Sequence, residues 1–303
     1  MKKKNIQKIN SRETELLTRT SKIMNVSIEE ARNYFKPFQS TLVLIKEEGR
    51  ELVENSLKDG KLTKINWYKD AYIINSEKSF FTHSQEFELG QIYILNASSL
   101  IPALVLDPAP EEKILDICAA PGGKTIQISK LSRNLSQISV NDEDNYRLRV
   151  MKKLFDLYEV PIKNFYNQPA QYLYKNIENE KFDKILIDAP CSGEGMINLE
   201  NPKTIGFWSV KKIKRLSKLQ KRIIESAVKL LKPGGTLIYS TCTFASEENE
   251  ENLNWAIKNL ELEVNPIEID IENKLPNENS YIKIIPNNYM EPFFVCKMTK
   301  KRL

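Results

Sequence analysis

The sequence predicts a Rossmann-like α/β fold, in which a doubly wound, mostly parallel seven-stranded sheet follows a small N-terminal α+β region. Two observations predict this fold. From about residue 106, short apolar runs alternate with helical stretches, a rhythm typical of a parallel sheet that helices cover on both faces. The last two apolar runs have no helix between them, so we expect them to pair as an antiparallel C-terminal hairpin at the sheet edge.

Five apolar runs are the candidates for the parallel strands: residues 114–118, 137–142, 163–166, 184–188 and 236–241. The hairpin is expected at residues 281–285 and 292–298. In an open sheet of this kind, ligands bind in the crevice at the carboxyl ends of the strands. The larger domain is therefore residues 106–303, and any site should be sought where its strands end.

Residues 1–105 form the smaller region. The segment from residue 11 to residue 58 is predicted to be helical, with Ser27 as a helix cap ahead of Glu29 and Glu30. Two short strands are expected at residues 62–67 and 71–74.

The composition is that of an ordinary globular protein, because 41% of the 303 residues are hydrophobic and 28% are charged. No apolar run reaches the roughly 18 to 20 residues of a membrane span, and the residues after the basic start are polar. We therefore expect a cytoplasmic monomer with no membrane partner. The excess of 45 basic over 40 acidic residues favours a nucleic-acid partner only slightly.

The four cysteines and the single histidine, His83, contain no C-x-x-C pair, so the sequence predicts no zinc site and no other bound metal. Without a secretory signal, a disulfide framework is not expected. Cys118 and Cys296 lie in apolar runs, where a cysteine is usually a small buried hydrophobe.

The first apolar run continues as Asp-Ile-Cys-Ala-Ala-Pro-Gly-Gly-Lys-Thr, residues 116–125, and opens into a helix. Glycines at such a turn let the backbone approach a ligand, and the helix start offers free N–H groups. A phosphate-binding loop is excluded because its pattern needs glycine at position 118. Asp142 ends the second run, where it can bind ribose hydroxyls or, alternatively, cap the helix that begins near Asp144.

Cys191 follows the fourth run in the segment Asp-Ala-Pro-Cys, and Cys242 follows the fifth in Ser-Thr-Cys-Thr. A doubly wound sheet that ends in such a hairpin is common to many S-adenosylmethionine enzymes, and both strand ends open onto the crevice expected to hold that methyl donor. Two cysteines there fit methylation of cytosine C5. A thiolate that adds to C6 makes C5 nucleophilic, Asp188 can hydrogen-bond the ring, and the second cysteine can assist release. The base must first leave its stack. The alternative is that both cysteines only pack, and the residues alone do not rank them.

Four segments together resemble the Nop/Sun family (RsmB/RsmF type) of RNA cytosine-C5 methyltransferases: residues 90–99, 116–125, 188–195 and 239–249. The resemblance runs from about residue 60 to residue 297 and implies a class I methyltransferase fold. It implies that S-adenosylmethionine donates a methyl group to C5 of cytosine in RNA through a covalent adduct of a cysteine with C6. Ribosomal RNA is the first choice of substrate, and transfer RNA is the alternative.

By the same resemblance, Cys242 is the nucleophile, Cys191 assists product release and Asp188 contacts the target base. In DNA cytosine methyltransferases the nucleophile follows the proline, so a DNA substrate would exchange the roles of the two cysteines. The residues implied to bind S-adenosylmethionine are Cys118, Ala119, Ala120, Pro121, Gly122, Gly123, Lys124, Asp142, Gln168 and Asp188. Gln168 departs from the family pattern, which often has an acidic residue there for the adenine.

The region before about residue 105 is then expected to recognise the substrate. An alternative of another class is a non-catalytic RNA-binding or ribosome-assembly factor that retains the methyltransferase fold.

A predicted helix over residues 210–231 carries five basic residues on one face, and we expect them to contact RNA phosphates: Lys211, Lys214, Arg215, Lys218 and Arg222. Its other face is apolar, with Ile213, Leu216, Ile223, Ala227 and Leu231. The alternative is that the basic face is only solvated. Phe207 and Trp208, just before this helix, are expected in the core rather than stacked on bases.

Overall fold

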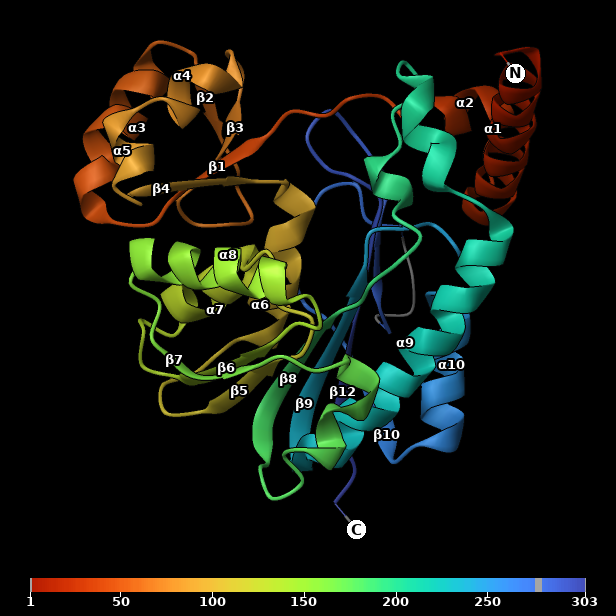
Figure 1. The fold of residues 1–303 in the computed structure, drawn as a ribbon. Helices are drawn as coiled ribbons and strands as arrows, with labels where there is room; N and C mark the ends of the chain where they lie inside the picture. The colour runs from red at the N-terminus through yellow and green to blue at the C-terminus, as the bar shows by residue number, and fades with distance from the viewer. Residues whose placement is uncertain (1, 276–279, 303) are drawn as a thin grey trace.

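The computed structural model describes residues 2–275 and 280–302. It contains two sheets, each with its own helices (Figure 1). In the described part of the chain, no helix is long and apolar enough to cross a membrane.

The smaller sheet is antiparallel and has the order β2-β3-β1-β4. Its strands are β1 (Thr41–Leu44), β2 (Leu62–Lys64), β3 (Ala71–Ile74) and β4 (Ile92–Leu95). The helices of this region are α1 (Lys2–Met24), α2 (Ile28–Asn33), α3 (Arg50–Lys58), α4 (Lys78–Thr82) and α5 (Gln85–Glu88), and η1 (Glu47–Gly49) is a short 3-10 turn. Ser27 caps α2, as predicted, by accepting a hydrogen bond from the Glu30 N–H.

One part of the helical prediction for this region is wrong, because β1 interrupts the segment 11–58. The strand reads Thr-Leu-Val-Leu, and all four residues are buried between two neighbouring strands. A short central strand that is buried on both faces shows neither the alternation of an exposed strand nor a helical period. The strand expected at 62–67 is also shorter, ending at Lys64.

The larger sheet follows the order β10-β12-β9-β8-β5-β6-β7. Its strands are β5 (Lys113–Asp116), β6 (Gln137–Asn141), β7 (Ile162–Tyr166), β8 (Phe182–Asp188), β9 (Leu231–Thr241), β10 (Leu262–Asn265) and β12 (Phe293–Lys300). β5 to β9 pair in parallel, which confirms the five predicted strands and the Rossmann-like α/β class. An eighth strand, β11 (Ile282–Ile284), pairs with β12 alone.

The predicted hairpin forms, since β11 and β12 pair antiparallel, but its expected place at the edge is wrong. β12 lies inside the sheet, between β9 and β10, and is antiparallel to both. The edge strand is β10, which the sequence does not predict. Its four residues, Leu-Glu-Val-Asn, include only two apolar side chains, and only one of the four is buried, so no apolar run marks it.

Two helical layers cover the larger sheet (Figure 1). On one face lie α6 (Ile101–Leu106), α7 (Gly123–Leu131) and α8 (Asn145–Leu157), and on the other α9 (Val210–Leu230) and α10 (Glu250–Asn259). Short 3-10 turns are η2 (Ala97–Leu100), η3 (Ala170–Lys175), η4 (Glu194–Met196) and η5 (Pro202–Phe207). The helix predicted to Leu231 ends one residue earlier, because Leu231 begins β9.

The first two helices do not pack on the small sheet; they lie on the opposite side of the molecule, beside α9 (Figure 1). Leu16 of α1 and Phe35 after α2 share a buried cluster with Trp208 and Phe244 of the larger domain. The Leu199 N–H donates to the Phe35 carbonyl at 3.0 Å, and Arg19 pairs with Glu247 at 2.7 Å. Residues that follow both strand-end cysteines are thus packed against the start of the chain.

Candidate active site

The carboxyl ends of β5, β6, β8 and β9 open onto one cavity of about 340 Å³. Its lining includes Cys118, Asp142, Asp188, Cys191 and Cys242, which come from four different strand ends. Their meeting follows from the parallel sheet, whose carboxyl ends share one edge. A second hollow of about 110 Å³ adjoins it on the other side of the glycine turn, where Tyr93 and Ser99 face Lys124.

The glycine turn is built for close backbone approach. Gly122 has φ +111°, and a Cβ atom there would lie 2.9 Å from the Phe155 ring, so only glycine fits. A Cβ on Gly123, which begins α7, would lie 3.0 Å from the Tyr93 hydroxyl. The packing of Phe155 and Tyr93 against the turn therefore favours glycine at both positions, beside the free N–H groups at the start of α7.

The sequence leaves open whether Asp142 binds a ligand or caps the following helix, and the structure gives the cap to Asp144. Asp144 is the cap of α8, since its carboxylate accepts hydrogen bonds from the N–H groups of Tyr146 and Arg147. Asp142 lies on the cavity wall and accepts a hydrogen bond of 3.2 Å from the Ala120 N–H. Asp142 is thus not the cap of α8, although its other oxygen accepts a hydrogen bond from the Asp144 N–H at 3.0 Å.

Asp116 is a buried carboxyl to which the sequence motifs assign no separate role. One of its oxygens accepts from the Thr125 hydroxyl at 2.8 Å, while its other oxygen is buried and has no hydrogen-bond partner among the described residues. Burial raises the pKa of Asp116 to about 7. An unpartnered buried acceptor beside the glycine turn is suited to a donor group of a bound ligand.

Asp188 is held by two side chains at the end of β8. Lys124 donates to one carboxylate oxygen at 2.6 Å, and the Ser240 hydroxyl donates to the other at 3.0 Å. Burial by itself would lower the pKa of Lys124, but the Asp188 carboxylate more than offsets this and raises it. Lys124 is therefore a cation, and it fixes the orientation of Asp188.

The two cysteines are in direct contact, with 3.1 Å between the Sγ atoms of Cys191 and Cys242. The hydrogen bond with Cys191, together with burial, raises the pKa of Cys242 well above its ordinary value. Both are free thiols, and both line the cavity. Of the other two cysteines, Cys296 is fully buried in β12, as expected, whereas Cys118 lines the cavity.

Glu194 connects the two cysteine loops, which are the loop after β8 that holds Cys191 and the loop after β9 that holds Cys242. Its buried carboxylate accepts from Trp208 Nε1 at 2.8 Å, from the Thr243 hydroxyl at 2.7 Å and from the Phe244 N–H at 2.8 Å. The Gly195 N–H donates to the Cys242 carbonyl at 3.0 Å. These bonds fix the separation of the two loops, and no sequence signal distinguishes Glu194 from a surface glutamate.

A second buried carboxylate, Glu248, holds the Cys191 loop. It accepts from the Ser192 N–H at 3.0 Å and from Gln220 Nε2 at 2.7 Å, and burial raises the pKa of Glu248 to about 7. Glu291 is a third buried carboxylate, which Asn96 of the N-terminal region reaches at 3.1 Å. Burial raises its pKa to about 7 as well.

Several predicted site residues lie outside the lining of the larger cavity. Ala119, Gly123 and Lys124 line the adjoining hollow instead, and Gly122 lines neither. The Gln168 side chain accepts a hydrogen bond from Asn176 at 3.1 Å, and Gln171 is the glutamine that lines the cavity instead. The five basic residues of α9 are all exposed, and the apolar face opposite them is buried. Arg222 donates to the hydroxyl of Tyr172.

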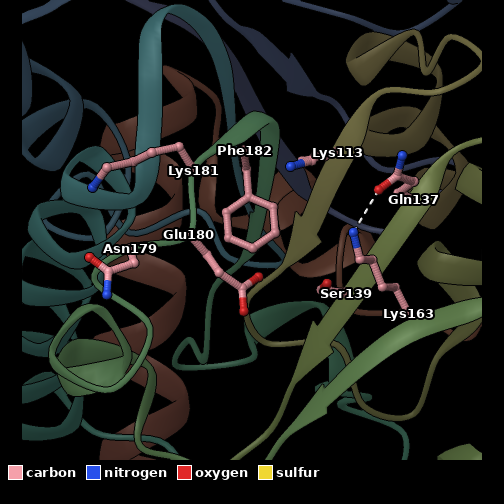
Figure 2. A pocket seen from close by; sticks show the side chains of 8 residues that line it. All are labelled: Lys113, Gln137, Ser139, Lys163, Asn179, Glu180, Lys181 and Phe182. Atoms are coloured by element: carbon pink, nitrogen blue, oxygen red, sulfur yellow. Dashed lines mark hydrogen bonds between the residues drawn. The ribbon is translucent and has the colours of Figure 1, made fainter.

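A smaller hollow of about 100 Å³ lies at the opposite end of the strands (Figure 2). It is lined by Lys113, Gln137 and Lys163, with Lys163 Nζ donating to Gln137 Oε1 at 2.7 Å. None of the predicted site residues lines it. Because ligands of such sheets bind at the carboxyl ends, the larger cavity is the candidate active site.

A family model described as 16S rRNA methyltransferase RsmB/F matches residues 103–299, which covers the whole cavity. The chain belongs to this family. Its resemblance to the Nop/Sun family is thereby confirmed, and it is a member of a family of RNA cytosine-C5 methyltransferases.

Relatives of this family member include enzymes named for two kinds of RNA. A tRNA (cytosine(49)-C(5))-methyltransferase of Pyrococcus abyssi is 35% identical over 255 residues, which are 80% of this chain and 81% of the relative. A probable ribosomal RNA small subunit methyltransferase B of Bacillus subtilis is 33% identical over 71% of this chain and 49% of the relative. The chain thus spans about half the length of this ribosomal relative.

Among solved structures, a methyltransferase homologue from Pyrococcus horikoshii matches with a TM-score of 0.77 and 32% identity. The match covers 90% of each chain, so the class I fold is confirmed over nearly all of the described residues.

Proposed function

We propose that the chain transfers a methyl group from S-adenosylmethionine to C5 of a cytosine in RNA, with Cys242 as the nucleophile. The observation that carries this proposal is the contact of 3.1 Å between Cys191 and Cys242, on the same cavity as Asp188 and the glycine turn. The order of roles for the two cysteines is the one that the resemblance to the Nop/Sun family implies.

The residues of the cavity fit S-adenosylmethionine, which supplies the methyl group as a sulfonium when bound. Cys118, Ala120 and Pro121 of the glycine turn line this cavity, and Asp142 can accept hydrogen bonds from ribose hydroxyls. The unpartnered Asp116 oxygen is suited to the ligand's ammonium group. Gln171, rather than Gln168, offers an amide on the cavity wall.

In the proposed reaction, the Cys242 thiolate forms a bond with C6 of cytosine, and the electron pair of the C5–C6 double bond makes C5 the nucleophile. C5 takes the methyl group, and the donor leaves as the neutral thioether S-adenosylhomocysteine. The C5 proton then passes to solvent while the sulfur–C6 bond breaks, the C5–C6 double bond returns and Cys242 leaves as a thiolate. Asp188, oriented by Lys124, hydrogen-bonds the ring during the addition. Cys191 assists release because its sulfur lies 3.1 Å from the sulfur that leaves.

Two single variants and their combination test these roles. Cys242→Ala is expected to abolish methyl transfer to RNA, because no other group supplies the nucleophile. Cys191→Ala is expected to allow one transfer and then to accumulate a covalent protein–RNA adduct, seen as a protease-sensitive band on a denaturing gel. The double variant is the control and should give no adduct. An adduct with Cys242→Ala, instead of Cys191→Ala, would reverse the roles and favour a DNA-type mechanism.

Ribosomal RNA is the proposed substrate, since the lead-in segment 90–99 and the motif segments 116–125, 188–195 and 239–249 look closest to those of the bacterial ribosomal members. Transfer RNA is the second candidate, and the name of the 35% identical Pyrococcus abyssi relative favours it. Bisulfite sequencing of both RNAs, from cells with and without the gene, identifies the cytosine that depends on it.

The alternative of another class is a non-catalytic RNA-binding or ribosome-assembly factor. It predicts RNA binding without methyl incorporation from labelled S-adenosylmethionine. Incorporation that disappears with Cys242→Ala would exclude it.

We also propose that the basic face of α9 binds RNA phosphates, because its five cations are exposed on a helix whose Leu219 and Ile223 line the cavity.

A further inference from the structure

An exposed apolar rim stands beside the Cys191 loop. Met196, which lines the cavity, is 62% exposed, and Phe207 is 40% exposed. Trp208, the next residue, is fully buried and donates to Glu194. The expectation that both rings lie in the core is therefore confirmed for Trp208 and wrong for Phe207, whose ring is left partly in solvent beside the Cys191 loop.

Met196 and Phe207 both lie over Gly193. A Cβ on Gly193 would lie 2.5 Å from Met196 Cε and 3.7 Å from Phe207 Cε2, so both side chains close over this turn of the Cys191 loop. Gly193 has φ +74°, a conformation that favours glycine. The apolar rim is thus part of the same loop that positions Cys191.

A cation completes this rim. Lys212 Nζ lies 4.6 Å from the centre of the Phe207 ring and donates to the Ser192 carbonyl at 3.3 Å. We call Met196, Phe207 and Lys212 the platform. An aromatic ring, a polarisable sulfur and an ammonium group are together suited to a nucleotide, whose base stacks and whose phosphate pairs with the cation.

The fold keeps Phe207 in this exposed position. Arg12 of α1 donates to the Gly206 carbonyl at 2.5 Å, immediately before the ring. Ile205 and Trp208 are buried in the cluster that α1 and α2 complete. Because Ile205 and Trp208 are fixed in this cluster on either side of Phe207, the Phe207 ring cannot turn into the core. Its exposure is therefore set by the fold.

We propose that the platform stacks the base of a nucleotide that neighbours the target cytosine in single-stranded RNA. This inference rests on the proposed function, because it needs a target base in the cavity. When that base leaves its stack, its neighbour loses a stacking partner. The platform stands at the cavity wall beside Cys191, and the exposed cations Lys211 and Lys214 follow Phe207 on α9. These charges favour an RNA strand over an apolar peptide as the occupant.

The test measures binding to three RNA oligonucleotides that span the methylated cytosine. One has every base, one lacks the base on the 5′ side of the target, and one lacks the base on its 3′ side. Wild type is expected to lose about 5- to 150-fold in affinity with one abasic RNA, the range for a single base–aromatic stack. Phe207→Ala is expected to lose the same factor with the intact RNA and nothing more with that abasic RNA, while Phe207→Trp should retain the discrimination.

Phe80→Ala is the matched control. Phe80 is 44% exposed, and Lys61 Nζ lies 4.6 Å from the centre of its ring, but it belongs to α4 of the small region and lines neither hollow at the glycine turn. This variant should discriminate between intact and abasic RNA as wild type does. Equal melting temperatures would show that neither alanine variant is misfolded.

The platform is overturned if Phe207→Ala still discriminates between intact and abasic RNA on both sides of the target. The same holds if Phe80→Ala abolishes the discrimination as Phe207→Ala does. Methyl incorporation by wild type is measured first: its absence counts against the proposed function, whereas incorporation without any coupling to Phe207 counts against the platform alone.

Discussion

Two thiols in contact inside a protein share their protons, and this contact governs the chemistry of the site. Cys242 is a neutral thiol in the free protein, because its hydrogen bond with Cys191 and its burial both raise its pKa. If Cys242 is the nucleophile, as proposed, its contact with Cys191 keeps it in the less reactive thiol form in the free protein.

Removal of Cys191 should lower the pKa of Cys242, since it deletes the first of these causes. We expect Cys191→Ala to be alkylated by iodoacetamide at Cys242 several-fold faster than wild type at about pH 7.5, because more thiolate is present. Peptide mass spectrometry measures the rate at each cysteine, and buried Cys296 serves as the internal reference. An unchanged alkylation rate at Cys242 would mean that Cys191 does not raise the pKa of Cys242.

At the scale of elements, the helix pair at the start of the chain supports the active-site loops. Leu16 of α1 packs in the cluster of Ile197, Ile205 and Phe244, and Phe244 follows Cys242 by two residues. The ring of Phe35 meets that of Phe244 edge-on, with 5.7 Å between their centres. The cysteine loops are thus braced by residues distant in sequence.

We expect Leu16→Ala to lower the free energy of unfolding by about 2 to 5 kcal/mol, as for other fully buried leucines. It should also raise hydrogen exchange of residues 194–208, which rest on this cluster. Leu62→Ala, in the core of the small sheet, is the control with a similar loss of stability. If residues 194–208 exchanged hydrogen equally fast in both variants, α1 would have no specific role in supporting this loop.

The basic face of α9 makes a second prediction at this scale. Replacing Lys214 and Lys218 by Gln is expected to weaken RNA binding and to lower the slope of log affinity against log salt by about 1 for each phosphate that is no longer neutralised. Lys163→Gln is the control, since Lys163 lies beside the hollow at the opposite end of the sheet (Figure 2). A salt slope equal to that of wild type would mean that this face is only solvated.

For the whole molecule, the cluster of buried carboxyls makes stability depend on pH. Burial raises the pKa of Asp116, Glu248 and Glu291 to about 7 each. The folded state then holds more protons than the unfolded state between about pH 4 and 7, so stability falls as the pH rises through this window. These three acids lie around the cysteine loops and the glycine turn. The loss of stability at higher pH therefore arises from residues that surround the candidate site.

Wild type should therefore have a lower free energy of unfolding at about pH 8 than at about pH 5.5, and Glu248→Gln should reduce this difference by about 1 to 3 kcal/mol. Urea unfolding at both values measures it. Asp183→Asn is the control. Although burial opposes it, Lys232 and the Lys113 N–H lower the pKa of Asp183, so its contribution is lost only at more acidic pH. A Glu248→Gln profile as steep as that of wild type would contradict the assignment.

The residues of the candidate site that directly follow a strand were predictable from the sequence. Residues 116–125, Asp188, Cys191 and Cys242 each follow a strand, and strand ends of a parallel sheet meet at one edge. The roles of Asp116, Glu194, Glu248 and Glu291 were not predictable, because a glutamate that bridges two loops has the same local sequence as a solvated one. Their burial arises only when distant segments pack together.

The sequence by itself determined the class of the fold, the five parallel strands and the pair of cysteines, since apolar periodicity and strand-end motifs are local properties. Only the tertiary structure decided that β12 lies inside the sheet, that β1 is a central strand, and that α1 and α2 brace the cysteine loops. The physical reason is the same in each case. Strand order, burial and helix docking depend on contacts between segments far apart in the chain, and these leave no periodic pattern in either segment.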